Sequence, residues 1–133
     1  MKFMLMMHAP RGDGEYGVSE WKSEELGAHI QFMRELNQDL REAGELVGAE
    51  GLAPPGQARI VRSSTEGAPE VTDGPFAESK EFLVGFWIVD VETAERAYAI
   101  AGKASTAPGP GGKPLGIKIE VRQVMGAPGS QCS

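Results

Sequence analysis

Hydrophobic and polar positions alternate at the start of the chain and predict a β-strand over residues 2–8. Its two faces carry Phe3, Leu5 and Met7 on one side and Met4, Met6 and His8 on the other. A signal peptide is the alternative for a start with one lysine and an apolar stretch. The stretch is shorter than a usual signal core, and no small-residue cleavage site follows it, so we favour the strand.

A helical pattern follows over residues 20–43. Its apolar side chains recur three or four positions apart, as one face of an amphipathic helix requires: Leu26, Ile30, Met33, Leu36 and Leu40. Ser19 or Ser23 is expected to cap the start of this helix, and Gly44 is expected to end it.

The remaining pattern predicts strands over residues 45–53, 58–64, 81–91 and 117–125, with a short return segment over 71–76. A second helix is expected over residues 92–103, capped by Asp90. Its packing face would be made of Ala94, Ala97, Tyr98 and Ala101. This order of elements predicts an α+β fold, a ferredoxin-like two-layer sandwich with both helices on one face of a mainly antiparallel sheet.

Segment 81–91 is apolar on both of its faces. One face holds Phe82, Val84, Phe86 and Ile88, and the other holds Leu83, Trp87, Val89 and Val91. A strand with one face in water should alternate instead. The helices cover one face of the sheet, and nothing else in a chain of 133 residues remains to cover the second. We therefore expect a homodimer packed sheet to sheet.

Length and charge narrow the classes of protein. We expect one domain over residues 1–126 and a flexible C-terminal tail over 127–133. The net charge of -6 disfavours binding to nucleic acid or anionic lipid, and no apolar run approaches the roughly 20 residues that span a bilayer. The single cysteine, Cys132, lies next to the C-terminus, so no internal disulfide can form. A cytoplasmic protein is the simplest expectation.

The stretch VTDGPFAESKEF (residues 71–82) precedes the aromatic-rich strand, GELVGAEGL lies upstream and IEVRQVM lies near the end. In this order the motifs resemble the DGPF-type branch of the YCII-related family over residues 1–126. The resemblance implies a ferredoxin-like fold that dimerises as an α+β barrel, and frequent genomic pairing with extracytoplasmic-function sigma factors. It also implies a histidine and an aspartate suspected of catalysis. The loops over residues 9–21 and 104–116 are longer than expected and would shape a pocket rim.

His29 is the first candidate for chemistry, because it lies within the apolar stripe of the first helix and so faces the sheet. It would serve as a general acid or base, or alternatively as a buried histidine bonded to a backbone carbonyl. The family resemblance places the suspected histidine in this context.

Asp73 opens the Asp-Gly-Pro-Phe turn, and it would either orient His29 or serve only as a turn residue. Asp13 is the alternative carboxylate for the same role. His8 is a candidate for ligand binding in the same pocket, or else an exposed histidine at the end of a strand.

No cofactor is expected, and two histidines without a third ligand make a metal site a poor fit. Two functions stay open. One is a small cofactor-independent enzyme that uses a His29–Asp73 acid–base pair on a small organic molecule. The other is a non-catalytic ligand-binding or regulatory protein that works with a sigma factor. A histidine and a carboxylate within about 3 Å, facing a cavity, would favour the enzyme.

Overall fold

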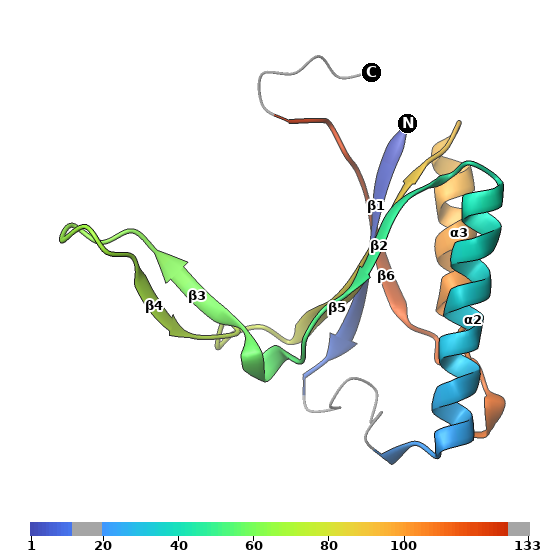
Figure 1. The fold of residues 1–133 in the computed structure, drawn as a ribbon, viewed down its shortest axis with the longest axis horizontal. Helices are drawn as coiled ribbons and strands as arrows, with labels where there is room; N and C mark the ends of the chain where they lie inside the picture. The colour runs from blue at the N-terminus through green and yellow to red at the C-terminus, as the bar shows by residue number, and fades with distance from the viewer. Residues whose placement is uncertain (12–19, 128–133) are drawn as a thin grey trace.

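Within the residues that the computed structural model describes, 1–11 and 20–127, four antiparallel strands form the main sheet in the order β2-β5-β1-β6. Their bounds are β1 Lys2–Pro10, β2 Leu46–Gly51, β5 Glu81–Asp90 and β6 Lys118–Gln123. Helices α2 (Ser23–Glu42) and α3 (Ala94–Ser105) lie on one face of this sheet (Figure 1). The predicted α+β class and order of elements, consistent with a ferredoxin-like fold, are confirmed. Asp13, Ser19 and Cys132 lie outside the described residues.

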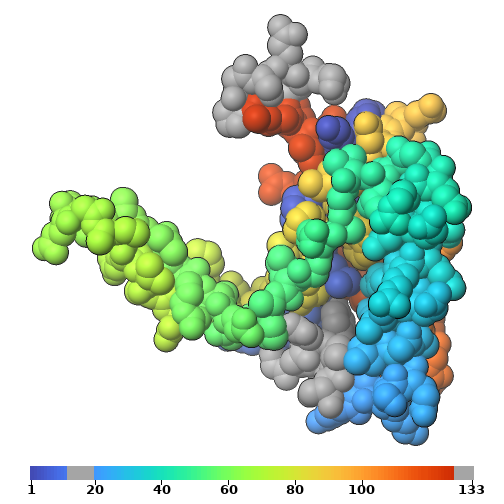
Figure 2. All heavy atoms as spheres, in the orientation of Figure 1, coloured from blue at the N-terminus to red at the C-terminus, as the bar shows by residue number. Residues whose placement is uncertain are grey.

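A separate hairpin of β3 (Arg59–Arg62) and β4 (Glu70–Asp73) extends from one end of the sheet, on the side away from the helices (Figures 1 and 2). A 3-10 turn, η2 (Pro55–Gln57), connects β2 to β3. The sequence predicted both segments but not their separation from the main sheet. Four-residue strands carry too little periodicity to specify which sheet they join.

The core lies between the two helices and the inner face of the sheet. Its buried side chains come from four elements and the residue after β5: Phe3, Leu5, Leu36, Leu40, Trp87, Val89, Val91, Ala97, Ile100, Ala101 and Ala104. The predicted face of the second helix is wrong at Tyr98, which is 56% exposed, whereas Ile100 is buried. Ile30 in the first helical stripe is also 41% exposed, because it lies at the edge of the face that meets the sheet.

Both predicted helix starts are corrected by the structure. Ser23 is the first residue of α2 rather than its cap, and the N–H of Lys22 donates to Oε1 of Glu25 at 2.9 Å. Thr93 rather than Asp90 caps α3, because its hydroxyl accepts the N–H of Arg96 at 3.2 Å. Asp90 is the last residue of β5 and instead accepts a hydrogen bond from the N-terminal amino group.

A β-bulge in β5 changes which residues share a face. Pairing with β1 shifts between Met7 and His8, so Val84 is the extra residue. Residues opposite one another across an antiparallel pair project to the same side. Leu83 pairs with His8 on the outer face, and Phe82 pairs with buried Ala9 on the inner face. The faces predicted for Phe82 and Leu83 are therefore exchanged, because a bulge reverses the alternation beyond it.

Two Gly→Ala substitutions, one within α2 and one just beyond its C-terminal end, should have opposite effects. Gly44 ends the helix with φ of 73°, as predicted from the sequence, and an L side chain there is strained. Gly44→Ala should lower the free energy of unfolding by about 1 kcal/mol. Gly27 lies inside the helix with open space around its Cβ position, so Gly27→Ala should raise it by about 0.5–1 kcal/mol. Urea unfolding of both variants measures this, and a loss of stability in Gly27→Ala would contradict the assigned helix.

Candidate functional site

His29 lies on the N-terminal half of α2, and its ring has one defined hydrogen-bond partner. Nδ1 is 3.0 Å from the carbonyl oxygen of Pro108, in a partly buried contact. A carbonyl oxygen can only accept, so Nδ1 carries the proton and Nε2 of the neutral ring keeps its lone pair. The Trp21 ring meets the His29 ring edge to face, with centroids 5.5 Å apart. None of the described residues hydrogen-bonds Nε2, which is therefore left as a proton acceptor.

A cavity of about 230 Å³ lies beside His29, between α2 and the strands β1, β2 and β5. Its apolar lining includes Met7, Met33, Ala49 and Trp87, and its polar side chains are those of His29 and Asn37. Glu50 pairs with Phe86 on the outer face, so it lines the cavity with its backbone. Gly85 helps to form this space, because a Cβ there would lie 3.1 Å from the Glu50 carbonyl oxygen and 3.5 Å from Met7 Cε. The predicted orientation of His29 toward the sheet is thus observed, in a small and mainly apolar cavity.

Trp87 and Asn37 form the far end of the same cavity. The indole Nε1 donates to Asn37 Oδ1 at 2.7 Å, and Trp87 is only 5% exposed. His29, Met33 and Asn37 are spaced by four residues and so share one face of α2. Sequence reasoning missed Asn37, although a polar residue in that spacing was visible.

The glycine- and proline-rich segment 104–116 contacts α2 near its start. Besides the Pro108 contact, the N–H of Gly111 donates to Glu25 Oε2 at 2.7 Å. Glu25 also accepts the N–H of Lys22, and these two backbone hydrogen bonds, that from Gly111 first, lower the pKa of Glu25 below its ordinary value. The loop was expected to shape the pocket rim; it contacts His29 directly, but none of its residues is among the described residues that line this cavity. A backbone carbonyl leaves no signal in a sequence, so Pro108 could not be predicted.

Asp73 ends β4 at the base of the projecting hairpin, and the structure does not bring it to His29 within one chain (Figure 1). Its side chain is 97% exposed, 3.7 Å from Nε of Arg59. Gly74 carries the tight contact of this turn. Its N–H donates to the Ala58 carbonyl at 3.0 Å, and a Cβ on Gly74 would lie 3.2 Å from that same group. Asp13, the alternative carboxylate, lies outside the described residues.

His8 lies on the outer face of the sheet, opposite to the face that α2 covers. Its Nε2 is 3.1 Å from Oε1 of Glu120 on the neighbouring strand β6. It pairs with Leu83 and Lys118 across the sheet. The two histidines are therefore separated by the sheet, and His8 does not line the cavity that contains His29.

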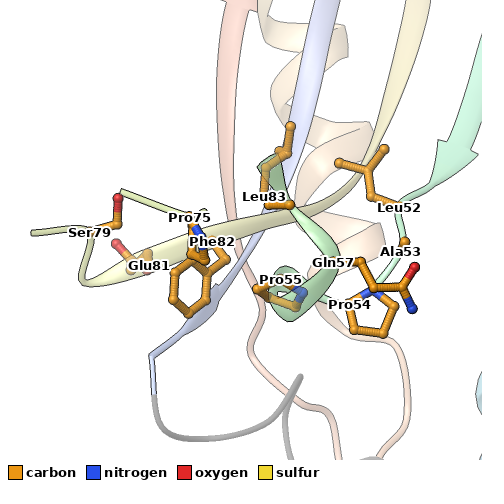
Figure 3. A pocket seen from close by; sticks show the side chains of 11 residues that line it. Leu52, Ala53, Pro54, Pro55, Gln57, Pro75, Ser79, Glu81, Phe82 and Leu83 are labelled. Atoms are coloured by element: carbon orange, nitrogen blue, oxygen red, sulfur yellow. The ribbon is translucent and has the colours of Figure 1, made fainter. Parts of the chain in front are cut away.

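A second cavity, of about 380 Å³, lies at the base of the hairpin (Figure 3). Three prolines contribute to its walls, and Leu52, Phe82 and Leu83 add apolar surface. Arg11 stabilises this region. Its guanidinium donates hydrogen bonds to the carbonyls of Ser79 and Phe76 at 2.6 and 3.1 Å. The same group lies 4.8 Å from the centre of the Phe82 ring. Glu81 is its sole titratable lining residue among those described, so this cavity offers less proton chemistry than the one beside His29.

Within residues 1–11 and 20–127, no three His, Cys, Asp or Glu side chains are grouped as a metal site requires. In the same ranges, none of the helices combines the length and the apolar character needed to cross a bilayer.

Glu25→Gln should weaken the attachment of the loop in a pH-dependent way. Because the pKa of Glu25 is lowered by folding, its charge stabilises the fold above the ordinary value of 4.5, and this stabilisation is lost as the pH falls through the lower folded value. Wild type should therefore exceed Glu25→Gln in unfolding free energy at neutral pH, with the difference vanishing in strong acid. Urea unfolding across this range measures it, and Glu24→Gln is the neighbouring control. A difference independent of pH would contradict the assignment.

Comparison with known proteins identifies the family of the chain. Residues 1–109 match the YCII-related domain. An uncharacterised protein of Rhizobium meliloti (strain 1021) is 34% identical over 90 residues, which cover 68% of this chain and 72% of that protein. The match includes α2, the hairpin, β5 and α3. The chain therefore belongs to the YCII-related family.

Proposed function

We propose that this YCII-related protein binds a small organic molecule in the cavity beneath α2, and that His29 Nε2 accepts a proton or a hydrogen bond from it. The observation that carries the proposal is the contact between His29 Nδ1 and the Pro108 carbonyl, at 3.0 Å. That contact assigns the proton to Nδ1 and leaves Nε2 as the acceptor in a mainly apolar cavity. A neutral imidazole nitrogen with an available lone pair can act as a general base.

In its enzymatic form, this proposal makes the protein a small cofactor-independent acid–base catalyst. The predicted His29–Asp73 pair would then need Asp73 from a second copy of the chain, since the hairpin carries its own Asp73 away from α2 (Figure 1). Asp13 is the other carboxylate that could take this role. The TDGPF turn is the basis on which we place the chain in the DGPF-type branch of the family.

The second candidate is a non-catalytic ligand-binding or regulatory protein linked to an extracytoplasmic-function sigma factor. It is favoured by the identity of the Nδ1 partner, because a backbone carbonyl rather than a carboxylate orients His29. Such an arrangement is sufficient for binding. Deuterium uptake from D₂O into the methyl group of acetophenone, faster than in buffer alone, separates the two candidates, since a protein that only binds does not accelerate exchange of a proton bound to carbon.

We also propose a homodimer formed through the outer face of the sheet, as an α+β barrel. Met4 pairs with Ile88 and Met6 pairs with Phe86, so four large apolar side chains lie together on that face. All four are only partly buried within one chain. An apolar sheet face in the middle of a domain is well suited to pack on its own copy around a two-fold axis.

Phenol is a suitable first probe of the cavity, because it is small, neutral and carries one acidic O–H. Wild type should bind it with shifts of the Trp87 indole signal in NMR spectra. His29→Phe keeps a ring of similar size but removes Nε2, and it should weaken phenol binding about fivefold, the scale of one lost hydrogen bond. Ile30→Phe places the same ring at a neighbouring position outside the cavity lining and should leave binding unchanged. Equal affinities for wild type and His29→Phe would refute the role of His29.

Ile88→Lys should convert the homodimer to a folded monomer. A lysine at this position would be buried without a partner charge in the proposed interface, which is costly. Tyr98→Lys introduces the same charge at an exposed site on α3 and should leave the dimer intact. Light scattering gives the mass of each variant, and circular dichroism checks its fold. A monomeric wild type at micromolar concentration would exclude the proposed assembly.

A further inference from the structure

The cavity beneath α2 contains a second polar side chain whose hydrogen-bonding role is assigned by its neighbour. The Trp87 indole N–H can only donate, so the Asn37 atom 2.7 Å away is its oxygen Oδ1. The amide nitrogen Nδ2 of Asn37 therefore carries two donor hydrogens, and none of the described residues accepts from it. The cavity therefore provides a hydrogen-bond donor at the end where Asn37 lies.

The other polar group on this face of α2 is His29, whose Nε2 is an acceptor because Nδ1 donates to Pro108. His29 and Asn37 are eight residues apart on one straight helix, so their α-carbons are separated by about 12 Å along its axis. Met33 lies midway between them on the same face, and Trp87 and Met7 lie across the cavity. The cavity therefore combines an acceptor, an apolar middle section and a donor, in that order.

The size of the cavity limits what fits between these two groups. A cavity of about 150 Å³ holds one benzene molecule, and this one measures about 230 Å³. The ligand considered is a single ring with a polar group at each end, each making a hydrogen bond of about 2.8 Å. The total length of ring, polar groups and hydrogen bonds is of the order of the separation between His29 and Asn37.

The charge of the lining narrows the ligand further. No described Lys or Arg side chain joins the lining, and Glu50 contributes only backbone, because it pairs with Phe86 on the outer face. An anionic ligand would lose its hydration in this mainly apolar cavity without a compensating cation, so a neutral ligand fits best.

We propose that the ligand of this cavity is a neutral, single-ring molecule with a hydroxyl group at one end and a carbonyl group at the other. The hydroxyl donates to His29 Nε2, the ring lies against Met33 and Trp87, and the carbonyl accepts from Asn37 Nδ2. This inference rests on the proposed function, and it adds Asn37 as the residue that selects the carbonyl end.

The experiment compares two probes on three proteins by NMR titration. 4-Hydroxyacetophenone carries both polar groups, and phenol carries only the hydroxyl. Asn37→Asp retains an oxygen for the Trp87 indole but removes the amide donor, so the fold should be preserved. We expect Asn37→Asp to weaken 4-hydroxyacetophenone binding about fivefold or more while phenol affinity changes less than about twofold. His29→Phe should weaken both probes alike, since both use the same hydroxyl contact.

The outcomes separate this inference from the proposal on which it rests. If Asn37→Asp affects the two probes equally, or affects neither, Asn37 does not read the carbonyl and the inference is wrong, while the role of His29 stands. If neither probe is weakened by His29→Phe, or wild type binds neither of them, the proposed function and the inference fail together. The Trp87 indole signal verifies that the Trp87–Asn37 contact survives in Asn37→Asp.

Discussion

Strand β5 is apolar on both faces, and the rest of the structure depends on this constraint. Its inner face needs cover, which α2 and α3 provide by packing Leu36, Leu40 and Ile100 against Trp87 and Val89. Burying Trp87 requires a partner for its indole N–H, because an unsatisfied buried donor costs about 1–3 kcal/mol. Asn37 is that partner. The need to cover the inner face of β5 thus determines the position of α2, the cavity beneath it and the polar group at one end of that cavity.

The bulge in β5 is the second consequence. Val84 is the extra residue in the pairing with β1, and Gly85 next to it allows the β2 backbone to approach closely. Bulges bend a strand and increase its twist. Here the bulge separates the regular part of β5, which faces the helices, from the part that leads toward the hairpin and the second cavity. The space next to His29 thus results from a glycine and a bulge in the sheet as much as from the helix.

The sequence predicted the class of fold, the order of its elements and the end of α2 at Gly44, because periodicity and glycine conformation are local properties. It predicted neither the exchange of Phe82 and Leu83 between faces nor the cap at Thr93. Those depend on the register between strands and on which of several polar residues the helix start meets. For the candidate site, periodicity was sufficient to orient His29 toward the sheet. The partner of His29 could not be predicted, because Pro108 contributes only its backbone and lies 79 positions away in the chain.

The nature of that partner matters for the chemistry of the histidine. An aspartate bonded to Nδ1 would both orient the ring and stabilise its protonated form by opposite charge. A carbonyl has no net charge, so it selects the tautomer and leaves stabilisation of the imidazolium to other groups. In a single chain, Nε2 of His29 can therefore accept a proton, but none of the described residues supplies a negative charge beside the protonated ring. In the proposed dimer the second copy packs on the face opposite to His29, so a carboxylate from its projecting hairpin would have to pass the edge of the sheet to reach this ring.

The Asp-Gly-Pro-Phe turn gains a physical explanation from the same geometry. Gly74 lies against the Ala58 backbone, where a Cβ would make a tight contact of 3.2 Å, and Arg11 holds the residues that follow. The turn thereby defines the direction of a hairpin with exposed apolar side chains, Val61 at 60%, Val71 at 57% and Phe76 at 63%. This hairpin extends on the same side as the half-buried outer face of the sheet (Figure 1). A second copy packed on that face would also lie along the hairpin. In the proposed homodimer, the main role of the Asp-Gly-Pro-Phe turn is therefore to support assembly. Any contribution of Asp73 to chemistry depends on that assembly.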